Sequence, residues 1–220
     1  AHLPVAEERT FVVPEAANRR FRPMSQDEIK GSLPQYGIDQ PYILYVGALE
    51  SRKNLPRLLH AYAKLRQWST RWRLVIVGAR KWKFSPIFDT VSRLELEPYV
   101  DFTGYVADEH LPALYAGADL FAFPSLYEGF GLPVLEAMAC GTPVVTSNTS
   151  SLPEVAGDAA LLADPTDVDA IAAAMQRVLS DAELANNLRV KGLANAAQFT
   201  WKLTARETIA VYEQILTRHK

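Results

Sequence analysis

The sequence has one cysteine, Cys140, among its 220 residues. A single thiol excludes an internal disulfide and a cysteine-based metal cluster, and the apolar stretch around Cys140 predicts a core residue. The sequence also lacks a signal peptide and any run of about eighteen apolar residues, which favours a cytoplasmic protein. Because the chain begins with Ala and opens without a strand-loop-helix unit, we expect a piece of a longer protein.

An excess of charge of either sign is absent as well. The formal net charge is −2, with 22% charged and 49% hydrophobic residues. This balance argues against a nucleic-acid partner and against disorder. The four histidines, at positions 2, 60, 110 and 219, have no metal-ligand spacing. We expect one α/β domain with appendages, because the length is too short for two full domains of this class.

One motif of another protein class is missing from the sequence, and a second is present but has a structural explanation. No Gly-x-Gly-x-x-Gly follows the first apolar run, where Gly47 is followed by Ala48 and Leu49, and this disfavours a dinucleotide dehydrogenase. The pair Asp167 and Asp169 has the Asp-x-Asp spacing that binds a divalent metal in another glycosyltransferase fold. Here the pair opens a helical pattern, so we predict that Asp167 is a helix N-cap.

Short apolar runs alternate with helical patterns from residue 42 onward. Buried strands of a parallel sheet read as nearly continuous apolar stretches, because helices cover both faces. We therefore predict an α/β fold, a Rossmann-like doubly wound parallel sheet of about six strands with helices on both faces and extra C-terminal helices. The predicted strands are 42–46, 74–77, 100–102, 120–123, 143–145 and 160–162.

The remainder of the chain divides into a linker and helices. Residues 1–40 are rich in proline and lack sustained periodicity, so we predict linker-like material. We predict a Rossmann-like domain over 41–200 and a last helical unit over 201–220. Helical patterns after the final strand span about 168–179, 182–198 and 203–216.

The most informative stretch is 127–138, YEGFGLPVLEAM, in which Glu128 and Glu136 stand eight positions apart. Between them, a glycine-flanked turn precedes a helix with Pro133 at its start. The first turn of such a helix leaves backbone N–H groups without partners, and these attract phosphate. The carboxylates of Glu128 and Glu136 can accept hydrogen bonds from neutral hydroxyl groups of a ligand. The stretch therefore predicts a phosphate-bearing ligand with hydroxyls on either side, such as a nucleotide-sugar.

This stretch resembles the signature of retaining glycosyltransferases of family 4, which have the GT-B fold. The resemblance runs from about residue 42 to the C-terminus and implies one half of that fold. Further pieces agree in order and spacing, at 45–54, 102–106, 114–119 and 123–125. The linker match is weaker, since Glu15 and Ala16 stand where the family often has Asn-Gly.

The resemblance implies roles for the charged residues of the site. Glu128 matches the acid that contacts donor-sugar hydroxyls near the reacting carbon, and Glu136 matches the acid that holds the ribose hydroxyls. Arg52 and Lys53 are placed to stabilise the leaving diphosphate, a task that makes a metal cofactor unnecessary. Many relatives have an Arg where this chain has Ala48, which places more of this task on Arg52 and Lys53.

The resemblance also implies donor-binding positions on several loops. Tyr105, Val106 and Leu111 match the seat of the nucleobase, and the alternative is that they only open a helix that buries Leu111. Trp82 and Lys83 form a basic aromatic loop that suits either a donor contact or an ordinary surface. The remaining donor-binding positions are small or apolar: Gly47, Gly78, Gly129, Phe130, Gly131 and Leu132.

The function implied is the donor-binding half of a retaining, metal-independent glycosyltransferase. It would transfer a hexose from a nucleoside-diphosphate sugar to a glycan or lipid-linked acceptor, which the other half binds, and the full protein would associate peripherally with the cytoplasmic face of a membrane. Residues 141–158 resemble mannosyltransferase-like bacterial members, so GDP-mannose is the first candidate, with a UDP-sugar as the other. Covalent and front-face routes both stay open.

Two alternatives belong to other classes. A noncatalytic nucleotide-sugar binding module would use the same pocket, but a sensor needs no second acid beside the sugar. A different GT-B enzyme is the second alternative, either a nucleotide-sugar epimerase or a phosphorylase. No motif for the pyridoxal phosphate lysine of a phosphorylase is present in the sequence.

Overall fold

A computed structural model of the chain describes residues 10–38, 41–78 and 85–218. Its centre is a six-stranded sheet in the order β3-β2-β1-β4-β5-β6, and every neighbouring pair is parallel. The strands are β1 (Tyr42–Val46), β2 (Arg73–Val77), β3 (Val100–Gly104), β4 (Leu120–Phe123), β5 (Val144–Ser147) and β6 (Leu161–Ala163). The predicted fold class is confirmed.

The strands form where the apolar runs predicted them, and each observed boundary lies within two residues of the predicted one. The central strands β1 and β4 have almost no exposed residue because helices cover both faces of the sheet. Ile43 of β1 pairs with Leu74 on one side and Leu120 on the other. The strand order reverses between β1 and β4, so the crevice beyond these two strands is where ligands of doubly wound sheets bind.

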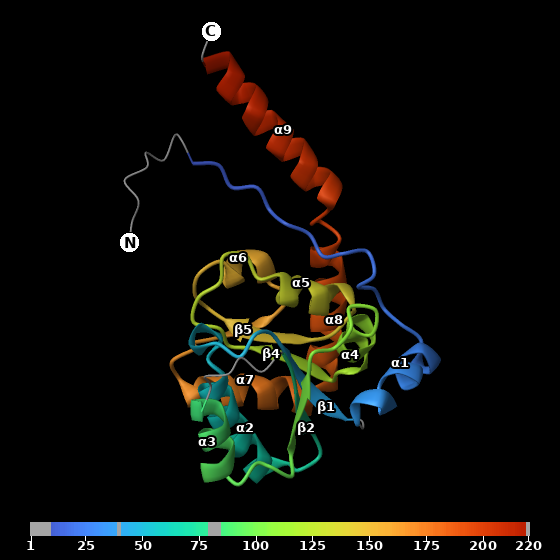
Figure 1. Ribbon diagram of the computed structural model, residues 1–220, viewed down its shortest axis with the longest axis vertical. Helices are drawn as coiled ribbons and strands as arrows, with labels where there is room; N and C mark the ends of the chain where they lie inside the picture. Colours follow the sequence, from blue (N-terminus) through green and yellow to red (C-terminus); the bar gives the residue numbers. More distant parts are fainter. Residues whose placement is uncertain (1–9, 39–40, 79–84, 219–220) are drawn as a thin grey trace.

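The helices form two layers on the sheet (Figure 1). On one side α2 packs against α3 and α7, and on the other α5 packs against α4, α6 and α8. The helices are α1 (Gln26–Ser32), α2 (Leu55–Trp68), α3 (Ser85–Arg93), α4 (Leu111–Gly117), α5 (Leu132–Ala139), α6 (Leu152–Ala156), α7 (Val168–Ser180), α8 (Ala182–Ala196) and α9 (Trp201–Arg218).

Local sequence explains where these helices begin. Proline stands in the first turn of α2, α4, α5 and α6, where its missing N–H costs no hydrogen bond. Asp167 accepts hydrogen bonds from the backbone N–H groups of Asp169 and Ala170 and caps α7 as predicted. In α2, the large buried residues follow helical spacing and form one apolar face: Leu55, Leu58, Leu59, Tyr62 and Leu65.

The linker prediction for residues 1–40 was wrong for its last part. Residues Gln26–Ser32 form α1, and a 3₁₀ turn follows at Pro34–Tyr36. Ile29 of α1 is buried in the core, which the irregular pattern of the segment had not indicated. The missed signal is the capping box, in which Ser25 and Glu28 each accept a hydrogen bond from the other's backbone N–H.

The three C-terminal helices match the predicted ranges to within two residues. The last of them, α9, extends away from the body of the domain, and the N-terminal segment from residue 10 leaves the body on the same side (Figure 1). Thr204 Oγ1 donates to the Pro14 carbonyl oxygen at 2.7 Å and joins these two segments. The apolar side chains of Ile209, Tyr212 and Leu216 on α9 are exposed.

Throughout the described ranges, no helix combines the length and the apolar composition that a bilayer crossing requires.

Candidate functional site

The charged residues of the predicted site come together at the point where the strand order reverses. Arg52 and Lys53 lie on a 3₁₀ turn, Ser51–Lys53, in the loop after β1. Glu128 lies in the loop after β4, the neighbour of β1. The backbone N–H of Leu126 donates to the Arg52 carbonyl oxygen at 2.8 Å and holds the two loops together.

Glu128 is the centre of a group of polar side chains that we call the Glu128 cluster: Glu50, Arg52, Lys53, Ser125 and Glu128. Its Oε1 accepts hydrogen bonds from Lys53 Nζ and Ser125 Oγ, both at 2.6 Å. Its Oε2 accepts from Arg52 Nη1 at 2.8 Å. Arg52 Nε also donates to Glu50 Oε2 at 3.2 Å. Two carboxylates thus face two cations, and their formal charges cancel.

The two cations differ in exposure. The side chains of Lys53 and Glu128 are each 8% exposed, whereas that of Arg52 is 45% exposed. Lys53 Nζ also lies 4.8 Å from the centre of the Phe123 ring, which offers a weak cation–π contact. Lys53 is therefore a buried partner of Glu128. Of these two cations, Arg52 is the one that a ligand in the crevice can reach.

Four serine hydroxyls surround the Glu128 loop. The sequence placed Ser125 in a segment that matches the family, but it did not indicate the other three as site residues. Ser125 donates to the Glu128 carboxylate, and Ser147 on β5 donates to the Ser125 carbonyl oxygen at 2.6 Å. Ser150 accepts a hydrogen bond from the Glu128 backbone N–H at 3.1 Å, and Ser151 lies 3.1 Å from the Glu128 carbonyl oxygen. Ser150 has φ +55°, a strained value for a residue with a Cβ.

The glycine-flanked turn precedes α5 as predicted. Gly131 is the N-cap residue with φ +120°, and a Cβ there would lie 2.9 Å from Leu152 Cδ2. A Cβ on Gly129 would meet nothing within 4 Å, so only a ligand would require a glycine there. Among the described residues, the backbone N–H groups of 129–132 have no hydrogen-bond partner. Such a helix start is suited to bind an anion.

Glu136 lies on α5 and has its own set of partners. Its Oε2 accepts a hydrogen bond from the buried Tyr115 hydroxyl at 2.9 Å. Burial raises the pKa of the Glu136 carboxyl, and the hydrogen bond from Tyr115 opposes that rise. The ring of Phe21, from the N-terminal segment, packs edge-on against Tyr115 with centroids 5.6 Å apart.

Two glycines close the ends of neighbouring strands. A Cβ on Gly78, after β2, would lie 2.1 Å from the Gly47 carbonyl oxygen, so no other residue fits without displacing the backbone. A Cβ on Gly47 would lie 2.9 Å from the Tyr45 hydroxyl oxygen. The loop that carries Trp82 and Lys83 lies outside the described residues.

The predicted base-binding positions lie after β3. Tyr105 is 74% exposed, Val106 is buried and Leu111 is half-buried at the start of α4. Of the other predicted positions, Phe130 and Leu132 lie at the start of α5, where each is at least partly accessible. These positions could form the wall of a nucleotide pocket or could only pack within the domain, so the base-binding role stays a prediction.

Cys140 is a core residue, as predicted. Burial raises the pKa of its thiol to about 12, so the thiol is unreactive at neutral pH. No group of three or more His, Cys, Asp or Glu side chains in the described part of the chain is arranged to hold a metal ion.

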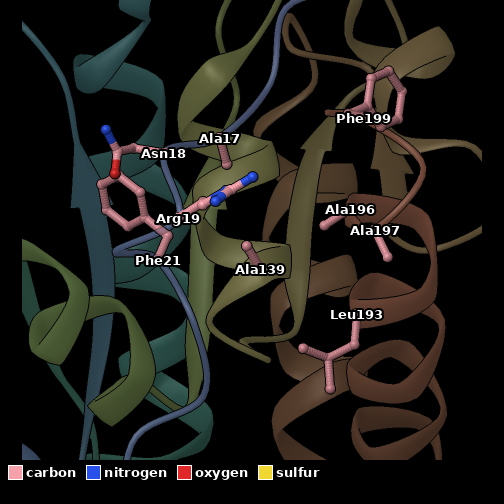
Figure 2. A pocket seen from close by; sticks show the side chains of 9 residues that line it. All are labelled: Ala17, Asn18, Arg19, Phe21, Ala139, Leu193, Ala196, Ala197 and Phe199. Atoms are coloured by element: carbon pink, nitrogen blue, oxygen red, sulfur yellow. The ribbon is translucent and has the colours of Figure 1, made fainter. Parts of the chain in front are cut away.

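A separate hollow lies between the N-terminal segment and α8 (Figure 2). Its volume is about 220 Å³, and its lining includes Phe21, the end of α5 at Ala139, and Leu193 of α8. Figure 2 shows mostly small apolar side chains on its α8 wall. It reaches the C-terminal end of α5 at Ala139, and its Phe199 packs against Phe130 beside the Gly131 turn, but no residue of the Glu128 cluster lines it.

Sequence comparison finds relatives that are glycosyltransferases. The chain is 45% identical over 200 residues to O-antigen chain mannosyltransferase B of Escherichia coli, covering 90% of this chain and 52% of the relative. It is 35% identical over 222 residues to the serotype-specific mannosyltransferase WbdA of Escherichia coli, covering 96% of this chain and 27% of the relative. The chain thus spans about half or less of the length of these relatives.

Solved structures share the fold. Sucrose-phosphate synthase from Thermosynechococcus elongatus superposes with a TM-score of 0.80 at 31% identity, over 94% of this chain and 52% of that one. The expected GT-B half is therefore confirmed. The family model described as glycosyl transferases group 1 matches residues 27–194, and the chain belongs to this family.

Proposed function

We propose that this chain is the donor-binding half of a retaining glycosyltransferase that transfers mannose from GDP-mannose without a metal. The observation that carries the proposal is the position of the Glu128 cluster beside the N-terminus of α5, at the reversal of strand order. A diphosphate in that crevice would meet Arg52 and the backbone N–H groups of 129–132. A cation and a helix start stabilise the charge on a leaving nucleoside diphosphate.

Glu128 acts on the sugar through position and charge. It accepts hydrogen bonds from two cations and a serine, all within 2.8 Å. A carboxylate whose charge is shared in this way is a weak nucleophile. We therefore propose that Glu128 contacts donor-sugar hydroxyls beside the reacting carbon, and we favour the front-face route, in which the leaving phosphate accepts the acceptor proton.

Glu136 and the loop after β3 would hold the nucleoside. Tyr115 keeps the Glu136 carboxylate in one orientation, which suits a clamp on the two ribose hydroxyls. Tyr105, Val106 and Leu111 would form the wall against which the base lies. The choice of mannose is supported by the names of the relatives, which are mannosyltransferases, and GDP is the carrier that we propose for it.

The acceptor would be a glycan or a lipid-linked saccharide bound by an N-terminal half. The exposed apolar side chains of α9 would pack against that half, with Ile209, Tyr212 and Leu216 in the contact. We propose that the full protein works in the cytoplasm, peripherally at the inner face of a membrane, where both a nucleotide-sugar and a lipid-linked acceptor are present.

Calorimetric titration of the chain with GDP, UDP and ADP in the presence of EDTA tests the donor site. We expect GDP to bind with micromolar affinity and the affinity to fall at least about tenfold in Lys53→Ala and Glu136→Ala. Lys64→Ala is a matched control, since Lys64 is an exposed lysine paired with Asp169 of α7. Binding that requires a metal, or that is equal in all four proteins, would refute the proposal.

A further inference from the structure

We propose that Glu128 discriminates the intact donor from the nucleoside diphosphate product and thereby promotes product release. This inference rests on the proposed function and goes beyond it. The observation behind it is that, among the described residues, the two cations of the Glu128 cluster are balanced by its two carboxylates. Lys53 and Arg52 both contact Glu128, and Arg52 also contacts Glu50.

The acceptor capacity of Glu128 favours a ligand with hydroxyls. A carboxylate has about four lone-pair positions. Lys53 and Ser125 occupy both positions of Oε1, and Arg52 occupies one of Oε2. One position of Oε2 remains for a sugar hydroxyl of the donor. The intact donor therefore reaches Glu128 with a hydrogen-bond donor, and its diphosphate carries two charges.

The transfer step changes both properties of the ligand. The bond between the sugar C1 and the β-phosphate oxygen breaks, and a bond forms between C1 and the acceptor oxygen. The electron pair of the broken bond stays on the phosphate oxygen, which takes the acceptor's proton. Above about pH 6 that proton passes to water, because the second pKa of a terminal phosphate lies near 6. The product then has a third charge and lacks the hydroxyls of the transferred sugar, which are the ones that would reach Glu128.

Among the residues that the structure describes, neither cation of the Glu128 cluster can compensate this added charge without breaking a contact, and the backbone N–H groups of 129–132 carry only partial charges that the diphosphates of both ligands would meet. Lys53 has a side chain only 8% exposed, and it is bonded to Glu128 at 2.6 Å. Arg52 is the exposed cation, but one of its N–H groups is also held by Glu128. The terminal phosphate of the product therefore faces the Glu128 carboxylate, and the repulsion weakens its binding.

Titration of GDP and GDP-mannose into the wild-type chain and Glu128→Gln at pH 7.5 tests this inference. Glutamine keeps an oxygen acceptor but removes the charge. We expect Glu128→Gln to bind GDP about tenfold more tightly, which is the effect of one unit charge roughly 6 Å away in a partly solvated site. GDP-mannose should bind no more tightly than to wild type, because the sugar loses a charged acceptor. Glu50→Gln is the control, since it changes the net charge equally and should tighten GDP-mannose as well as GDP, because the acceptor that faces the sugar is kept.

A second measurement uses only the wild-type chain and remains valid if Glu128→Gln fails to fold. A site with uncommitted cations would bind GDP more tightly as its terminal phosphate ionises. We instead expect GDP affinity, relative to GDP-mannose, to fall between pH 5.5 and 7.5, the interval of roughly one to two pH units around that phosphate pKa. Within the described ranges, the charged groups that contact Glu128 are Arg52 and Lys53, and Arg52 also contacts Glu50. Glu136, whose pKa burial raises, contributes to both ligands and cancels in the ratio.

The outcomes separate the two proposals. If neither nucleotide binds the wild-type chain, the donor site and the role of Glu128 both fail. If both bind, but Glu128→Gln shifts them equally or the GDP ratio rises with pH, the donor site stands and the discrimination by Glu128 is refuted. A selective gain for GDP in Glu128→Gln, absent in Glu50→Gln, supports it.

Discussion

Replacement of Lys53 by methionine should destabilise the fold, although Lys53 lies in a ligand-binding loop. The substitution keeps the aliphatic stem of the side chain and removes the ammonium group. Glu128, whose side chain is 8% exposed, would lose its Lys53 partner at 2.6 Å and keep those to Arg52 and Ser125. The perturbation therefore leaves a buried carboxylate with only an exposed cation to balance it.

The expected cost follows from the burial of the pair. Removal of one partner from a buried ion pair costs about 3–5 kcal/mol when no other partner remains. Because Arg52 and Ser125 still hold the carboxylate, we expect about 2–3 kcal/mol. For a domain of this size, that corresponds to a fall in melting temperature of roughly 4–12 °C.

Urea unfolding followed by circular dichroism measures this effect. We expect the double variant Lys53→Met/Glu128→Gln to be more stable than the sum of the two single changes by about 2 kcal/mol, since the unpaired charge is then gone. Lys64→Met breaks an exposed pair with Asp169 and should cost less than about 1 kcal/mol. A cost for Lys53→Met no larger than that of Lys64→Met, with additive double-variant energies, would refute the reasoning.

Four further predictions concern other parts of the site. Burial raises the pKa of Glu136, so the contribution of this carboxyl to stability should fall as the pH rises above its ordinary pKa of 4.5. Urea unfolding at several pH values measures this dependence, and Glu136→Gln should remove it. Gly78→Ala should destabilise the fold by about 1–3 kcal/mol or more and lower the melting temperature accordingly, because its Cβ would lie 2.1 Å from a backbone carbonyl oxygen. Gly129→Ala, with open space around the Cβ, should leave the melting temperature within about 2 °C and yet weaken GDP binding about tenfold in calorimetry. Ser150→Gly should be about 1 kcal/mol more stable than Ser150→Ala in chemical unfolding. Both variants lose the hydroxyl that accepts a hydrogen bond from the Glu128 N–H, but only glycine relieves the backbone strain at φ +55°.

Much of the fold could be predicted because β-strands buried on both faces leave a simple apolar pattern. The convergence of Arg52, Lys53 and Glu128 was predictable for a related reason. Each follows a strand, and all carboxyl ends of a parallel sheet lie at one edge. The order of the strands within the sheet leaves no comparable pattern in the sequence, so only the structure shows that these residues lie at its reversal.

The contacts within the site depend on details finer than any sequence pattern. Sequence reasoning assigned Lys53 to the diphosphate, and the structure shows it bonded to Glu128, because the pairing depends on rotamers and on the offset between two loops. Ser147 and Ser150 belong to a third segment of the chain and gave no local signal. Helix α1 was missed because its seven residues contain one buried side chain, Ile29, which is too few for a recognisable period.

The hydrogen bond between Thr204 and Pro14 has an evolutionary consequence. The chain enters and leaves the folded body at adjacent points, so a replacement of the whole unit requires only two junctions that lie side by side. The same unit makes up 52% of one relative and 27% of another, which fits its reuse in proteins of different size. The proposed function then predicts that chimeras joined at these two positions exchange the preference for the nucleotide-sugar while the rest of the host protein stays unchanged.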